Sequence, residues 1–231
     1  MTAFPGATGV TRLRVYDWPT VDGLRGGSPH LHTVSTEGYV VLAGEGTLQT
    51  LSGAGYQEHD LRAGTVLWFT PGTVHRLVNG GDLDILVVMQ NSGLPEAGDA
   101  VMTFPLPILR DRDAYARAAA LDPPGAEAAQ RRRDLAIEGY LQLRARVQAE
   151  GPDALDDLYE AAAHLVQNRT DSWRNLWQVR ALAQAYRTGE QLDALAAGRP
   201  DHLADSAVHT GLPAPEPPRY GMCGHLSTWT L

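Results

Sequence analysis

The sequence contains no lysine, and all 19 of its basic residues are arginines. A chain without lysine cannot form a Schiff base through a lysine amine. It also cannot supply the lysine of a phosphate-binding P-loop. Composition alone therefore excludes two common kinds of active site.

Cysteine is nearly absent as well. The single cysteine, Cys223, cannot form an internal disulfide, which is typical of a reducing compartment. No apolar run reaches the roughly 18 residues of a membrane span, and the first residues lack the charged and apolar regions of a secretory signal. The formal net charge of −8 would repel nucleic acid and anionic membranes. We therefore expect a cytoplasmic globular protein that binds neither nucleic acid nor membranes.

The character of the chain changes near residue 110. Residues 1–109 contain short runs rich in Gly, Val, Thr and Leu, separated by turn signals such as Asp22-Gly23 and Pro71-Gly72. Many short strands at this spacing predict a β-sandwich or β-barrel. Residues 201–231 form a third part, a proline-rich tail that ends in a possible strand over 226–231 and that we expect to fold back on the barrel.

The middle part, residues 110–200, is predicted to be α-helical. Apolar residues recur at helical spacing over 153–168. Further helices are predicted over 127–150 and over 171–187, the last of these ending at Gly189, a residue type favoured just after a helix. The aromatic side chains on the last helix, with their apolar neighbour, are expected to pack on the barrel or on a second subunit: Trp173, Leu176, Trp177 and Tyr186.

Three histidines and one glutamate carry the strongest chemical signal. His30 and His32 are two residues apart, so on a strand they point to the same face. Glu37 follows after a short turn and opens the next strand, and the Pro71-Gly72 turn delivers His75 to the start of another. Three imidazoles and a carboxylate suit one divalent transition metal, with iron the first expectation and Mn, Ni, Co, Cu or Zn the alternatives. On an octahedral ion these four ligands would leave two positions open.

Two segments resemble the sequence motifs of the cupin superfamily. Residues 27–44 are similar to G-x5-H-x-H-x(3,4)-E-x6-G, although the leading glycines stand at positions 26 and 27, close to His30. Residues 64–79 are similar to G-x5-P-x-G-x2-H-x3-N, with the proline displaced by one, at Pro71. The resemblance covers about residues 12–90. It implies an N-terminal jelly-roll β-barrel in which His30, His32, Glu37 and His75 hold the metal, followed by a helical region that matches no family we can name.

A cupin barrel does not fix a reaction, because the superfamily includes dioxygenases, isomerases, epimerases, cyclases, decarboxylases and binding proteins without activity. We expect a metal-dependent oxygenase acting on a small organic molecule, with Glu37 as both ligand and catalytic base. The alternatives are a non-redox isomerase, epimerase or cyclase, and a small-molecule-binding module without turnover. Substrate contacts are expected among residues on the barrel strands: Tyr39, Gln49, Trp68, Leu77 and Met89.

Four further expectations concern the surroundings of the barrel. A barrel followed by helices also resembles transcription regulators of the arabinose-operon type, but residues 110–199 carry 13 arginines against 14 acidic residues, so no basic recognition helix is present. Exposed sheet edges invite association, and we expect a homodimer. Arg76 has the opposite strand parity to His75 and is expected to face outward or to meet a partner chain. Cys223 and His225 are expected to pack in a segment that folds back as a lid or an edge strand.

Overall fold

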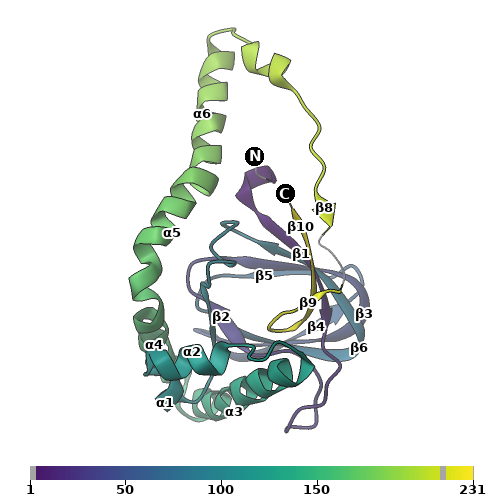
Figure 1. Cartoon of the computed structure of the whole chain (residues 1–231), viewed down its shortest axis with the longest axis vertical. Coiled ribbons are helices and arrows are strands. Elements are labelled where there is room, and N and C mark those ends of the chain that lie inside the picture. Colours follow the sequence, from purple (N-terminus) through teal and green to yellow (C-terminus); the bar gives the residue numbers. More distant parts are fainter. Residues whose placement is uncertain (1–3, 214–216, 231) are drawn as a thin grey trace.

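The computed structural model describes residues 4–213 and 217–230. Its strands close into a barrel, α-helices cover one end and side of that barrel, and a long helical arm rises beyond it before the chain returns to the sheet (Figure 1). The predicted order, a β-barrel followed by an α-helical region, is confirmed. Position 231, the end of the predicted C-terminal strand, lies outside the described residues.

Two long strands form the frame of the barrel. β3 (Glu37–Ser52) and β6 (Val74–Met89) pair antiparallel along most of their length, with irregularities in register between Val41 and Gly46. Bulges of this kind bend a strand pair and change which face each later residue occupies. Gly44 lies in this bend at a φ of +75°, and a Cβ there would lie 2.2 Å from the carbonyl oxygen of Asp82. Only glycine fits this position without moving the backbone.

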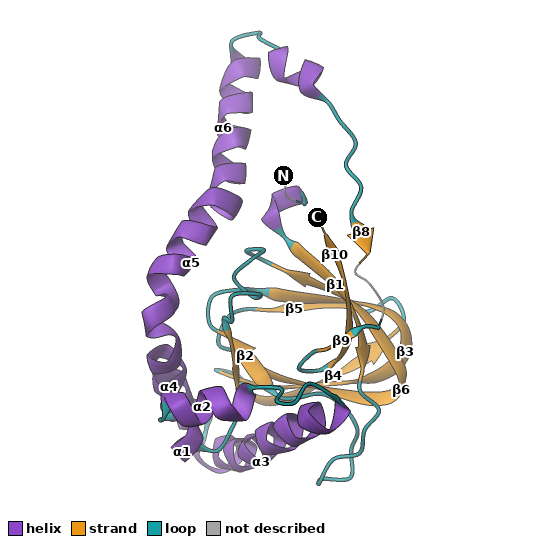
Figure 2. Cartoon of the chain, viewed as in Figure 1, coloured by secondary structure: helices purple, strands orange, loops and turns teal. Residues whose placement is uncertain are grey.

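The other strands extend and close this frame (Figure 2). The main path runs β4 (Gly55–Arg62), β3, β6, β1 (Gly9–Val15), β10 (Gly224–Thr230) and β8 (Leu212–Pro213). Off this path, β2 (His30–His32) pairs with β6 and β7 (Ala100–Met102), β5 (Val66–Phe69) pairs with β3, and β9 (Arg219–Tyr220) pairs with β10. The last strand of the chain therefore lies beside the first. As separate folding units, the three parts 1–109, 110–200 and 201–231 remain a prediction.

The helices follow directly after β7. They are α1 (Leu106–Leu109), α2 (Arg112–Ala119), α3 (Ala126–Glu150), α4 (Asp156–Val166), α5 (Thr170–Trp177) and α6 (Ala183–Ala196), with a π-helical turn over Gln178–Leu182 between the last two. Among the described residues, none of them combines the length and the apolar character needed to cross a membrane.

The predicted end of the last helix at Gly189 is wrong. The helix continues to Ala196, and the chain leaves it at Gly198, which has a φ of +68° and is followed by Pro200. A glycine with positive φ just past the last turn, with a proline soon after it, is a stronger stop than a glycine that keeps helical geometry. Gly189 therefore lies within an exposed helix, where it weakens that helix slightly.

Two apolar cores hold the structure together. One fills the barrel and includes Leu48, Leu77 and Ile85, all buried. The other lies between the barrel and the helices, where Tyr140 of α3 and Leu158 of α4 meet Leu51, Val74 and their neighbours. Burial of apolar surface on this scale is the main stabilising contribution to a fold of this size. The helical region is therefore joined to the barrel by a continuous core.

Arg76 corrects one expectation. Its side chain does face out of the barrel, as strand parity predicts, but it is completely buried and meets neither solvent nor a partner chain. Its guanidinium donates to both carboxylate oxygens of Asp22, at 2.6 and 3.1 Å, and to the hydroxyl of Thr20 at 3.1 Å. The ring of Tyr140 lies 5.8 Å from the guanidinium carbon. The loop before β2 and helix α3 thus cover this arginine together.

Gly139 lets α3 lie directly on the barrel. A Cβ at this position would lie 2.1 Å from the carbonyl oxygen of Thr103 and 2.5 Å from the carbonyl carbon of Phe104. We expect Gly139→Ala to lower the free energy of unfolding by about 2–3 kcal/mol, because overpacking a rigid backbone contact forces the helix away. Chemical denaturation measures the change. Gly53→Ala, where a Cβ meets nothing within 4 Å, should stay within about 0.5 kcal/mol of the wild type; equal effects would contradict the contact.

Candidate metal centre

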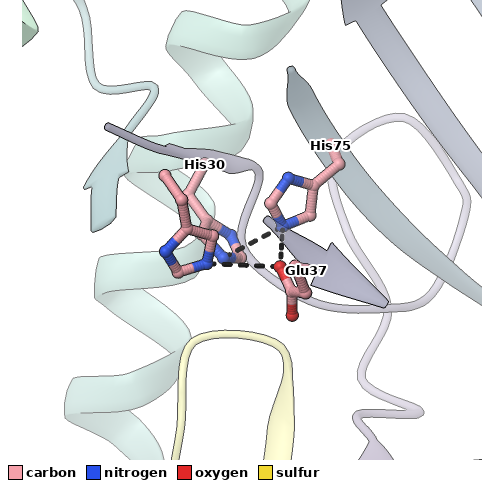
Figure 3. A group of neighbouring side chains, drawn as sticks. His30, Glu37 and His75 are labelled. Carbon is pink, nitrogen blue, oxygen red and sulfur yellow. Dashed lines mark hydrogen bonds and ion pairs between the residues drawn. The ribbon is translucent and has the colours of Figure 1, made fainter. Parts of the chain in front are cut away.

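Four side chains from three strands meet inside the barrel. His30 and His32 come from β2, Glu37 is the first residue of β3, and His75 lies near the start of β6, directly opposite His30 in the β2–β6 pairing. All four are buried, and one potential ligand atom from each lies within 4.8 Å of the others. Figure 3 shows the ring of His75 directed at the carboxylate of Glu37, with the ring of His30 beside it. The sequence pattern therefore brings together the residues that it predicted to be neighbours.

The outer nitrogens of the three rings have acceptors of their own. Nδ1 of His30 lies 2.9 Å from the carbonyl oxygen of Ser28, and Nδ1 of His75 lies 3.1 Å from that of Thr73. Nδ1 of His32 lies 2.7 Å from a carboxylate oxygen of Asp99. Carbonyl and carboxylate oxygens only accept, so each Nδ1 must carry a proton. In a neutral ring, Nε2 is then left with a lone pair.

These lone pairs converge on one point. Nε2 of His30 and Nε2 of His75 are 3.1 Å apart, and Oε2 of Glu37 lies 3.2 Å from Nε2 of both His32 and His75. That oxygen is buried and has no hydrogen bond of good geometry among the described residues. Buried acceptors facing one another destabilise a fold unless a cation or protons lie between them. The donor set and its geometry therefore fit a divalent transition metal, and the four residues form a possible metal site.

Burial and mutual charge set the protonation of the group. Burial and the neighbouring His75 and His32 lower the pKa of His30 well below its usual value. Burial by itself would raise the pKa of Glu37, but the nearby His75 and His32 outweigh it and lower that pKa well below the usual range. For His32, the contacts with Asp99 and Glu37 outweigh burial and raise the pKa to about 10, so this ring must lose the proton on Nε2 when it binds a metal. Glu37 is thus held as a carboxylate and His30 as a neutral imidazole, the forms in which both bind metals.

A cavity of about 360 Å³ extends from this group toward the strands β1 and β10. Its walls are largely apolar, with polar groups at a few points, as in binding sites for small organic molecules. The side chains of the metal site that line it are His30, His32 and Glu37. The other lining residues are Gly9, Thr11, Leu13, Tyr39, Val87, Met89, Pro95, Glu96, Arg219, Met222, Cys223, Leu226 and Thr228.

Comparison with protein families now decides the nature of the barrel. The family model described as "Cupin domain" matches residues 21–89, a stretch that contains all four candidate ligands. The barrel is a cupin domain. No curated protein matches the chain. The helical region beyond residue 89 lies outside the family match.

Solved structures resemble a part of this chain. One is an uncharacterized conserved protein with a double-stranded β-helix domain from Klebsiella pneumoniae, with 21% identity and a TM-score of 0.29 over 36% of this chain and 66% of that one. Another is the nucleoside dehydratase Pac13 from Streptomyces, with 17% identity and a TM-score of 0.31 over 41% and 66%. A predicted oxalate decarboxylase from Thermotoga maritima has 22% identity and a TM-score of 0.27 over 36% and 64%. The match spans just under two thirds of each of these chains, and similarity at this level concerns the fold alone.

The five expected substrate contacts of the cupin domain separate into three groups. Tyr39 and Met89 line the cavity beside the metal site. Leu77 is buried in the barrel core and does not border the cavity. Gln49 and Trp68 lie on the outside: Gln49 hydrogen-bonds with Glu58 at 2.9 Å beneath α3, and Trp68 is 72% exposed. The structure thus places two of the five where a substrate in this cavity would touch them.

The C-terminal segment of the chain forms one wall of the cupin cavity. Cys223 is buried with its Sγ 3.8 Å from Nδ1 of His30, and Met222 lies beside it on the cavity. Burial raises the pKa of the Cys223 thiol, so the thiol keeps its proton. Gly27 allows this approach, because a Cβ there would lie 2.3 Å from the Cα of Cys223. The segment folds back as expected and continues into β10, which is not an edge strand because it pairs with β1 on one side and with β8 and β9 on the other. Cys223 was expected only to pack in the protein interior, but it contacts a ligand histidine of the metal centre. His225 does not contact the centre and packs against Tyr16.

Asp99 is a residue of the centre that the sequence did not indicate. It is fully buried, and it is the only carboxylate among the described residues that contacts a ligand histidine from outside the group. Such a partner fixes the tautomer and orientation of a metal-binding imidazole. The sequence carries only a weak indication of this role. Asp99 follows Gly98 and precedes a short strand, but it lies 67 positions from His32.

We expect Asp99→Asn to weaken metal binding about 10- to 100-fold, because the amide still accepts from Nδ1 of His32 but lacks the carboxylate charge. Competition against a chelator of known affinity measures the change. Asp60→Asn, the same substitution at an exposed position on β4, serves as the control. Equal affinities for wild type and Asp99→Asn would show that Asp99 does not support the centre.

Proposed function

We propose that the protein is a metal-dependent oxygenase that acts on a small, largely apolar organic molecule bound in the 360 Å³ cavity. The observation that carries the proposal is the convergence of three imidazole nitrogens and one carboxylate beside that cavity. His30, His32, Glu37 and His75 would hold the metal. A bound divalent transition metal, with iron the first choice, would supply a redox-active Lewis acid beside the substrate.

The chain supplies acid–base groups next to this position. Glu37 is ionised, so it can accept a proton from a substrate group in the cavity. Tyr39 lines the same cavity, and burial together with the charge of Glu37 raises its pKa well above the usual value. It therefore stays a neutral phenol and can donate a hydrogen bond to the substrate. These two residues suit proton transfer and orientation at the end of the cavity nearest the ligands.

The cavity walls also limit the substrate. The apolar side chains around the cavity are Leu13, Val87, Met89, Met222 and Leu226. Much of the substrate must therefore be apolar, because burying apolar surface against these side chains is favourable. Polar groups remain at separate points, the hydroxyls of two threonines and the charged ends of Glu96 and Arg219. A molecule with an apolar body and one polar end fits this distribution. The volume lies near the lower end of the range for small-molecule sites, about 300–1,000 Å³.

One experiment separates the three possible functions. Protein purified without chelators is assayed for metal and is then incubated with a deproteinised extract of small molecules, with and without oxygen. Mass spectrometry follows both solutions. Oxygen-dependent loss of one compound supports the oxygenase. The same loss without oxygen indicates an isomerase, epimerase or cyclase, and binding without loss indicates a binding protein. Glu37→Gln is the matched control, and its full activity would remove Glu37 from the proposed role.

We also propose a cytoplasmic location and small molecules as the partners of this protein. A cytoplasmic location is supported by the single cysteine, which is buried and forms no disulfide. The acidic net charge supports small molecules as ligands in preference to nucleic acid.

A further inference from the structure

We propose that the substrate of the cavity is a small monocarboxylic acid, and that Arg219 binds its carboxylate. This inference rests on the proposed function, because it concerns what the same cavity holds. It adds the chemical class of the substrate and a residue that selects for it. Arg219 belongs to β9, in a part of the chain that lies outside the cupin family match and that the sequence motifs do not indicate.

Strand pairing places Arg219 on the inner face of the sheet. Leu226 of β10 lies opposite Arg219 on one side and opposite Leu13 of β1 on the other. Residues directly opposite each other in a sheet share a face, and all three line the cavity. The next residue along β9, Tyr220, lies opposite His225, and the centres of their rings are 5.2 Å apart. Because successive side chains on a strand alternate between the two faces, that ring pair lies outside and Arg219 faces the cavity.

Arg219 brings a positive charge to the wall of this cavity. It is the only arginine that lines the cavity, and among residues 4–213 and 217–230 no carboxylate lies within ion-pair distance of its guanidinium. The acidic residue at the rim, Glu96, is engaged elsewhere, because its Oε2 accepts a hydrogen bond from the backbone N–H of Gly93 at 2.7 Å. The N–H groups of Arg219 are therefore available to a ligand in the cavity.

The planar guanidinium matches a carboxylate. Two of its parallel N–H groups can donate to the two carboxylate oxygens at once. One arginine balances one negative charge, so a monocarboxylate fits. A phosphate ester carries up to two negative charges, and the second would remain unbalanced in a cavity that also contains the carboxylates of Glu37 and Glu96.

The position of Glu96 also argues against an α-amino acid. Its Oε1 lies 3.7 Å from the place that a Cβ on Gly9 would take. On β1, Gly9 and Leu13 are four residues apart, which corresponds to about 13 Å along the strand. Glu96 and Arg219 therefore lie toward opposite ends of the cavity, whereas the ammonium and carboxylate groups of an α-amino acid are attached to the same carbon.

A short molecule can join Arg219 to the metal site. Arg219 and Cys223 are four residues apart in the chain, so their Cα atoms are at most about 14 Å apart. The Sγ of Cys223 in turn lies 3.8 Å from Nδ1 of His30. Two further lining residues of this segment, Met222 and Leu226, are apolar. An acid with a short apolar body can therefore bind Arg219 at one end and present its other end to the ligand residues.

Calorimetric titration of the full chain, as purified, tests the inference. The probes are the straight-chain carboxylates from butanoate to octanoate and, for each length, the primary amide, the alkylamine and the alkyl phosphate. We expect at least one carboxylate to bind with a dissociation constant of about 1 mM or tighter, which is ordinary for ligands of this size. The amide of the same length should bind at least about 10-fold more weakly, because it cannot form the charged pair.

Two variants assign this preference to Arg219. Arg219→Gln should weaken binding of the carboxylate about 10-fold and leave binding of the amide unchanged. Arg219→Glu should reverse the preference, so that the alkylamine binds more tightly than the carboxylate, a reversal that loss of folding could not produce. Arg14→Gln is the matched control and should bind like the wild type, because Arg14 is adjacent to Leu13 on β1 and faces away from the cavity.

Three results would overturn the inference: no carboxylate of the series binds, an alkyl phosphate binds more tightly than the carboxylate of its length, or Arg219→Gln binds the carboxylate as tightly as the wild type. The titrations follow binding and not turnover, so they are separate from the test of the oxygenase. Carboxylate binding that depends on Arg219, without oxygen-dependent loss of any compound, would support this inference and contradict the proposed reaction. Oxygen-dependent loss of a compound that has no carboxylate would do the reverse.

Discussion

Replacing His75 with alanine should abolish stoichiometric metal binding. The ring contributes one of the converging nitrogens and is completely buried, so no nearby water-exposed group can take its place. We expect the affinity for Fe²⁺, Mn²⁺ or Zn²⁺ to fall at least about 100-fold, more than for loss of a supporting residue such as Asp99. Elemental analysis of protein purified without chelators, and calorimetric titration with each ion, measure the change.

Thermal unfolding gives a second measurement of the same prediction. An ion that binds only the folded state adds about 2.7 kcal/mol of stability at 100 times its dissociation constant. A chelator should therefore lower the melting temperature of the wild type and leave that of His75→Ala unchanged. His59→Ala, at an exposed histidine on β4, should behave like the wild type. If the wild type neither contains nor binds any of the three ions, the proposed metal centre is wrong.

Asp22→Ala should be among the most destabilising single changes in the chain. It leaves the guanidinium of Arg76 buried between the barrel and α3 without its carboxylate partner, which accepts two of its hydrogen bonds. Breaking a buried ion pair from one side costs about 3–5 kcal/mol. Chemical denaturation should show this loss, and the double variant Asp22→Ala/Arg76→Met should recover much of it because no buried charge remains.

An exposed ion pair provides the contrast. Arg110 and Asp157 are joined at 2.8 Å on the surface, and Arg110→Ala should cost at most about 1 kcal/mol. If Asp22→Ala lowers the free energy of unfolding no more than Arg110→Ala does, then solvent reaches Arg76 after the substitution.

The same ion pair makes stability depend on pH in one direction. Burial alone would raise the pKa of Asp22, but hydrogen bonds from Arg76 and Thr20 and the charge of Arg76 lower it. Its folded-state pKa is thus below the unfolded value of about 3.9. The stabilisation is fully present above that value and is lost as the pH falls below it. The stability difference between the wild type and Asp22→Asn should be constant from about pH 5 to 8 and shrink below about pH 4.

The candidate ligands could be predicted because their geometry is local. His30 and His32 share a face through the two-residue period of a strand, and Glu37 and His75 follow short turns. Gln49 shows where this reasoning fails. It has the same parity as Glu37 and Tyr39, but the bulges between Val41 and Gly46 shift the register, so it points outward beneath α3. Trp68 lies outward for a simpler reason, since its neighbour Phe69 is the residue that packs on His75.

The remaining parts of the centre depend on pairings between distant segments. Cys223 reaches His30 because the last strand of the chain pairs with the first, an arrangement that residues 221–225 alone do not specify. Asp99 reaches His32 through the pairing of β2 with β7. Arg76 is covered because α3 crosses the outside of the barrel at Gly139. For Arg76, the local sequence pattern predicted only the direction of the side chain. For Cys223 and Asp99, it predicted no contact with the metal centre. Tertiary packing determines which residues these three side chains contact.

The position of β10 beside β1 has a consequence for the order in which the centre is assembled during synthesis. All four donor residues are synthesised well before Met222, Cys223 and Leu226, which form one wall of the cavity. A growing chain therefore carries its complete donor set while one side of the barrel is still open to solvent. An ion can enter by that side before β10 pairs with β1 and closes it.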